Sequence, residues 1–98
     1  MEKTIKQQKK EFMDAYRWAL KVQKACMFKP FSVEVEFGYT KGNYNERNID
    51  AWTVTLWFYG EEKCFHITWH PYYDRDDEFF ERAAQLEEYL ADKGVTLK

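Results

Sequence analysis

The sequence predicts a small α+β domain in the order α-β-β-β-α, in which two helices cover one face of a three-stranded antiparallel meander. Three stretches alternate apolar and polar residues, as is typical of strands with one buried and one exposed face. Stretches with helical periodicity precede and follow them. Because only one sheet face is apolar, we expect both helices on that face. The 98 residues are expected to form one domain, residues 1–98.

The first helix is predicted from about Thr4 to Phe28, where neither glycine nor proline occurs. Lys29 precedes Pro30 and is therefore pushed out of the helical region of backbone space, which ends the helix. Trp18 lies away from the apolar side, so it either anchors a partner or packs against a neighbouring element. The apolar side is predicted to comprise Ile5, Phe12, Tyr16, Ala19, Leu20, Cys26 and Met27.

A basic stripe runs along the opposite side of this helix. It could contact the phosphates of a nucleic acid, or it could simply solvate the outer face of an amphipathic helix. The candidate nucleic-acid-binding residues in this stripe are Lys6, Lys10, Arg17, Lys21 and Lys24.

The strands are predicted over Phe31–Tyr39 and within Ala51–His70, with a polar loop, Thr40–Asp50, between them. A two-residue Gly60-Glu61 turn would pair Trp52 with Trp69, whereas a four-residue loop would shift every pair by two. Both registers keep each side chain on the same face. The buried face is expected to comprise Phe31, Val33, Val35, Phe37, Trp52, Val54, Leu56, Phe58, Phe65, Ile67 and Trp69.

The second helix is predicted to begin at an Asp74 N-cap, followed by acidic residues that the helix dipole favours. Its core stripe comprises Phe79, Ala83, Leu86 and Leu90. Gly94 is suited to the position after the helix C-cap, and Val95–Leu97 is a candidate short strand.

The second face of the sheet is the candidate functional surface. It holds aromatic residues that the core does not need, and Trp and Tyr are enriched in the hot spots of protein interfaces. We expect this face, centred on Trp57, to bind another protein or a second copy. The candidate binding residues are Glu34, Glu36, Thr55, Trp57, Tyr59 and His66 on this face, together with Trp18.

The same face also holds Ser32, Thr53, Cys64, Thr68 and His70, so carboxylates, imidazoles and a thiol share one plane. His66 and His70 are four strand residues apart, about 13 Å, which is too far for one metal ion. The middle strand separates the glutamates from the histidines, and a flat face does not exclude water. We therefore expect a non-enzymatic protein without metal, cofactor or small-molecule substrate.

Charge is unevenly distributed along the chain. Residues 1–30 hold eight Lys/Arg and three acids, net +5, whereas residues 31–98 hold seven Lys/Arg and fourteen acids, net −7. The acidic part could imitate a phosphate row and occupy a basic site on a nucleic-acid enzyme, by analogy with small inhibitors from phage and mobile elements. Acids on the outer side of a helix are more often simply a solvated face.

No apolar run is long enough to cross a bilayer, and the N-terminus lacks the apolar region of a signal peptide. Cys26 and Cys64 do not form a disulfide framework or a C-x-x-C motif. We therefore expect a cytoplasmic location and no membrane contact.

The predicted element order is similar to that of the double-stranded-RNA-binding domain. That family opens its second helix with a lysine cluster aimed at phosphates. This chain has Asp74-Arg75-Asp76-Asp77-Glu78 there, which would repel them. The similarity is confined to element order, so it implies no functional residues.

Overall fold

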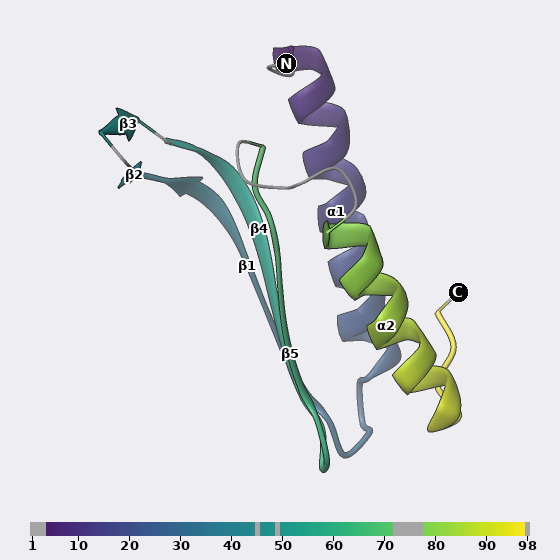
Figure 1. Cartoon of the computed structure of the whole chain (residues 1–98). Helices are drawn as coiled ribbons and strands as arrows, with labels where there is room; N and C mark the ends of the chain where they lie inside the picture. Colours follow the sequence, from purple (N-terminus) through teal and green to yellow (C-terminus); the bar gives the residue numbers. More distant parts are fainter. Residues whose placement is uncertain (1–3, 45, 49, 72–77, 98) are drawn as a thin grey trace.

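The computed structural model describes residues 4–44, 46–48, 50–71 and 78–97. Both described helices lie on the same side of a three-stranded antiparallel sheet (Figure 1). The predicted α+β architecture is therefore confirmed. The molecule is elongated, with principal extents of 42 × 23 × 20 Å.

Helix α1 comprises Ile5–Ala25. Thr4 is its N-cap, and the Thr4 hydroxyl accepts a hydrogen bond from the backbone N–H of Gln7 at 3.1 Å. Cys26 is the C-cap, so the helix ends somewhat before the expected boundary. Small side chains let α1 lie close to the sheet, because the residues that it buries are Ala15, Ala19 and Val22.

The main sheet consists of β1 (Ser32–Thr40), β4 (Ala51–Tyr59) and β5 (Cys64–Trp69), in the order β1-β4-β5. Within the expected loop, β2 (Asn43–Tyr44) and β3 (Arg47–Asn48) pair as a separate two-stranded ribbon. Figure 1 shows this ribbon beyond the ends of β1 and β4, at the opposite end of the molecule from the β4–β5 turn. We call the ribbon end of the sheet the distal end.

The register of the β4–β5 hairpin differs from that of a two-residue turn. Tyr59 pairs with Cys64 and Val54 with Trp69, so residues 60–63 form a four-residue loop. The N–H of Gly60 closes this loop by donating to the carbonyl of Lys63 at 2.8 Å. The predicted pairing of Trp52 with Trp69 is therefore wrong. The alternative, a four-residue loop that shifts every pair by two residues, is confirmed.

Helix α2 comprises Glu78–Asp92, and its predicted core stripe is buried. The expected Asp74 N-cap lies outside the described residues. At the other end, Gly94 has φ +81° and its N–H donates to Ala91, while that of Val95 donates to Leu90. These two bonds form a Schellman motif, which confirms the predicted role of Gly94. Val95–Leu97 forms no strand, and Val95 instead packs into the core.

The core occupies the part of the sheet that both helices cover. Leu56, Phe58, Ile67 and Trp69 are fully buried there. Two predicted core residues at the distal end are instead exposed, Phe37 by 55% and Trp52 by 58%. On the apolar side of α1, three residues are likewise exposed: Ile5, Leu20 and Met27. Over its described residues, α2 runs beside the C-terminal part of α1, so of the two described helices only α1 lies over the distal end (Figure 1).

Candidate functional site

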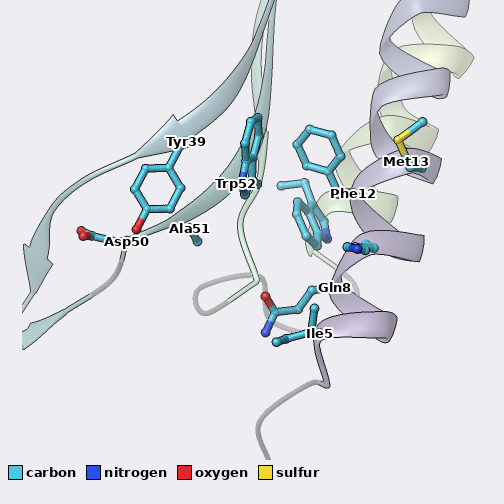
Figure 2. A pocket seen from close by; sticks show the side chains of 10 residues that line it. Ile5, Gln8, Phe12, Met13, Tyr39, Asp50, Ala51 and Trp52 are labelled. Carbon is cyan, nitrogen blue, oxygen red and sulfur yellow. The ribbon is translucent and has the colours of Figure 1, made fainter.

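A cleft of about 640 Å³ opens between the N-terminal half of α1 and the distal end of the sheet. We call it the aromatic cleft. Figure 2 shows Trp52 from the sheet and Phe12 from the helix facing one another, with Ile5 and Gln8 nearer the start of α1. Its lining residues are Ile5, Gln8, Lys9, Phe12, Met13, Tyr39, Asp50, Ala51, Trp52 and Trp69.

Ring contacts hold the walls of the aromatic cleft in place. Phe12 meets Trp52 and the buried Trp69 edge to face, each with ring centroids 6.0 Å apart. Tyr39 contacts Trp52 from the neighbouring strand at 6.3 Å. Such aromatic pairs contribute about 0.5–1.5 kcal/mol each beyond the burial of their area. The cleft is therefore built on core residues, although its outer walls face solvent.

Few charged groups lie in the lining of the aromatic cleft. Asp50 accepts a hydrogen bond from the N–H of Gly42 at 2.9 Å, which fixes this carboxylate at the strand end. Lys9 is exposed, and the neighbouring Lys10 pairs with Asp14 at 3.2 Å. The interior is therefore apolar, with polar groups at its rim.

On the opposite face of the sheet, Glu34, Trp57 and His66 lie in register across the three strands. The rings of Trp57 and His66 stack with centroids 5.3 Å apart and an interplanar angle of 6°. Thr55 bonds Thr68 at 3.2 Å, and Tyr59 is exposed. The β2–β3 ribbon lies beyond the ends of β1 and β4 and not over the middle of the sheet (Figure 1), so its described residues leave the middle of this face open.

Two residues expected on the open face are buried instead. Thr53 bonds Thr40 through their hydroxyls at 2.8 Å, and His70 lies just beyond the end of β5. The remaining predicted residues of this face are exposed or half-buried. The structure therefore assembles the predicted open face around Trp57 but shortens it at the distal end.

Trp18 belongs to the contact between the helices. Its indole N–H donates to the Glu87 carboxylate at 3.1 Å, and its ring meets Phe79 edge to face at 5.5 Å. The reading in which Trp18 packs against a neighbouring element thus accounts for this residue, and we do not place it in the candidate site.

The basic stripe on α1 is exposed along its length, at Lys6, Lys10, Arg17, Lys21 and Lys24. On α2, Glu81, Glu87, Glu88 and Asp92 are exposed, while Asp74, Asp76 and Asp77 lie outside the described residues. The described residues of both charged faces thus point to solvent. This is expected whether these faces bind a partner or are only solvated.

Within the described ranges, no three His, Cys, Asp or Glu side chains come close enough together to hold a metal ion. Both cysteines are free thiols, and burial raises the pKa of the Cys26 thiol. Cys64 is exposed next to the β4–β5 turn. Neither helix, over its described residues, is long and apolar enough to cross a bilayer.

No protein family, curated protein or solved structure matches this chain. The candidate site therefore rests on the geometry of the chain itself.

The aromatic cleft was not anticipated from the sequence, because alternation placed Trp52 and Phe37 on the apolar face and hence in the core. In the structure α2 is 15 residues long and α1 is 21, so one end of the nine-residue β4 has less helical cover, and no pattern in the sequence shows which end this is.

Proposed function

We propose that this chain is a non-enzymatic protein-binding module and that the aromatic cleft receives apolar side chains of a partner. One observation supports this most strongly: Trp52, Tyr39 and Ile5 line one cleft while remaining 58%, 52% and 74% exposed. Exposed apolar groups that gather in one place are typical of interaction surfaces, and Trp and Tyr are frequent anchors there.

A protein partner fits this cleft better than a small molecule does. Small-molecule sites enclose about 70–90% of the ligand surface. Here both walls carry exposed side chains, such as Ile5 on α1 and Trp52 on β4, and the charged groups of the lining lie at the rim. A partner that projects one or two large apolar side chains would cover these walls.

The open face centred on Trp57 is a second candidate surface for the same function. The stacked Trp57 and His66 rings form a flat platform, with Glu34 beside it in register. A second copy of this chain is an alternative occupant for either surface. The proposal includes a reducing, cytoplasmic location, which the free thiols of Cys26 and Cys64 support.

The test is a selection from a random library of displayed peptides against the wild-type protein, followed by affinity measurements on the selected peptides. We expect these peptides to contain aromatic or large aliphatic anchors and to lose at least tenfold in affinity with Trp52→Ala. Trp57→Ala is the matched control, since it removes the same side chain from the other face.

Equal affinity for wild type and Trp52→Ala would disprove the assignment of the cleft, and loss with Trp57→Ala would assign binding to the open face. Light scattering on the same samples reports self-association. A dimer dissociated by Trp52→Ala would identify a second copy as the occupant of the cleft.

A further inference from the structure

Strand β1 is an edge strand of nine residues, and among the described strands of the main sheet its neighbour is β4 alone. Its sequence contains neither lysine nor proline, two residues that commonly protect sheet edges from added strands. The opposite edge of the sheet is β5, and α2 contacts it. There, Arg82 of α2 donates to the backbone carbonyl of His66 on β5 at 3.0 Å, so the helix satisfies part of that edge.

The apolar side of the β1 edge has exposed neighbours on α1. Tyr16 contacts Phe37 with ring centroids 4.6 Å apart, which places this flank of α1 next to β1. Met13 and Leu20 lie one turn to either side of Tyr16 on the same flank, and both are exposed. An added strand would thus meet exposed apolar groups on α1 as well as the edge of β1 that faces away from β4. Met13 and Tyr39 also line the aromatic cleft, so the two surfaces are continuous.

The other side of the β1 edge is acidic. Glu34 and Glu36 are exposed on the open face, and in the part of the chain that the structure describes neither forms an ion pair. Like charges opposite one another destabilise a pair of strands, whereas opposite charges stabilise it. Pairing β1 with its own copy around Val35 would set Glu34 against Glu36, so the charge favours a basic strand over a second copy.

We propose that β1 accepts a strand from a partner protein in which Lys or Arg residues alternate with apolar residues. Backbone hydrogen bonds along the edge supply affinity, and the basic residues face Glu34 and Glu36. The apolar residues pack beside Phe37, against the exposed Met13 and Leu20 of α1. This inference rests on the proposed protein-binding function and adds to it the binding mode and the chemistry of the partner.

The experiment uses fluorescein-labelled ten-residue peptides in which Val alternates with Lys or with Glu, and measures anisotropy with the full chain in 150 mM salt. The variants are Glu34→Lys/Glu36→Lys and, as a control of equal charge change on α2, Glu81→Lys/Glu88→Lys. All four glutamates are exposed, so the fold is expected to tolerate both double changes. Hydrogen exchange with bound peptide reports on Ser32–Thr40.

We expect the Lys/Val peptide to bind wild type, to lose at least tenfold in affinity with the β1 double variant, and to stay within twofold with the α2 variant. The Glu/Val peptide should bind only the β1 double variant. Bound peptide should slow amide exchange in β1 and leave α2 unchanged.

Equal losses in both double variants, or no slowing of exchange in β1, would overturn the proposal, because binding would then be nonspecific or located elsewhere. Failure of the Lys/Val peptide to bind, while display-selected peptides still depend on Trp52, would reject strand addition and leave the protein-binding function standing. If neither peptide class binds, both proposals fall.

Discussion

Phe12 and Trp52 meet edge to face across the aromatic cleft, with ring centroids 6.0 Å apart and ring planes at 85°. The same Phe12 ring contacts Trp69, which is fully buried. Phe12 therefore joins the core to the cleft, and Trp52 gains an ordered position without being covered. A binding wall supported by core residues in this way is prepared for a ligand at little additional entropic cost.

The two tryptophans that contact Phe12 should differ sharply in their contribution to stability. Trp69 is 1% exposed, so Trp69→Ala is expected to lower the free energy of unfolding by about 3–5 kcal/mol. Trp52→Ala removes two ring contacts of a half-exposed side chain and should cost less, about 1–3 kcal/mol. Urea denaturation measures both values. Similar losses for the two variants would show that Trp52 is buried in solution.

Trp18 and Glu87 are expected to couple the two helices. Trp18→Phe keeps the packing against Phe79 but removes the N–H donor, and Glu87→Ala removes the acceptor. A double-mutant cycle should give a coupling energy of about 0.5–1.5 kcal/mol. A coupling near zero would mean that the indole bonds water instead, and that Trp18 stabilises the fold by packing alone.

Gly60 is predicted to be intolerant of any side chain. A Cβ atom at this position would lie 2.9 Å from Oη of Tyr89, 3.0 Å from Cε1 of Phe58 and 3.2 Å from the carbonyl oxygen of Lys63. Gly60→Ala should therefore cost about 1–3 kcal/mol through overpacking. The cost should be smaller in a Tyr89→Phe background, which removes the closest atom. Thermal unfolding of the four proteins tests this, and equal costs in both backgrounds would contradict it.

The Tyr89→Phe variant of that series also tests the contribution of the Tyr89 hydroxyl to stability. The Tyr89 hydroxyl is buried without a hydrogen-bond partner among the described residues. Its removal should be neutral or slightly stabilising, because a buried unsatisfied polar group costs free energy.

The ion pair between Lys93 and Glu62 should make stability depend on alkaline pH. Glu62 accepts a hydrogen bond from Nζ of Lys93 at 2.6 Å, and this raises the pKa of Lys93 above its ordinary 10.5. A raised folded-state pKa stabilises the fold below the unfolded-state value, and this contribution is lost as the pH rises through the raised pKa.

The difference in melting temperature between wild type and Lys93→Gln should therefore be present at pH 8 and shrink at strongly alkaline pH. High salt should reduce it as well, because the pair is at the surface. A difference that stayed constant from pH 8 to strongly alkaline pH would show that Lys93 contributes by contacts other than its charge.

Much of the fold followed from the sequence because the two kinds of periodicity are strong. Alternation in β1 and β4 identified the strands and their faces, and the position of Gly94 identified the end of α2. The pairing register did not follow. A shift by two leaves every side chain on its face, so patterning alone cannot select it. In the observed register Phe58 pairs with Phe65, and both rings contact Tyr89 from α2.

The candidate site was harder to predict for a different physical reason. Alternation shows which face Trp52 occupies but not how far the covering helices extend along the strand. The exposure of Trp52 depends on where α2 lies against β5, which is a tertiary property. The open face around Trp57 was predictable, because it needs only the strand faces.

The four indole N–H groups offer the most direct test, since each reports on a different place: Trp18 between the helices, Trp52 in the cleft, Trp57 on the open face and Trp69 in the core. We would titrate ¹⁵N-labelled protein with a display-selected peptide, after assigning each indole signal from single Trp→Phe variants. We expect the Trp52 signal to shift with saturation while that of Trp57 stays in place. A shift of Trp57 with Trp52 unchanged would contradict binding in the aromatic cleft.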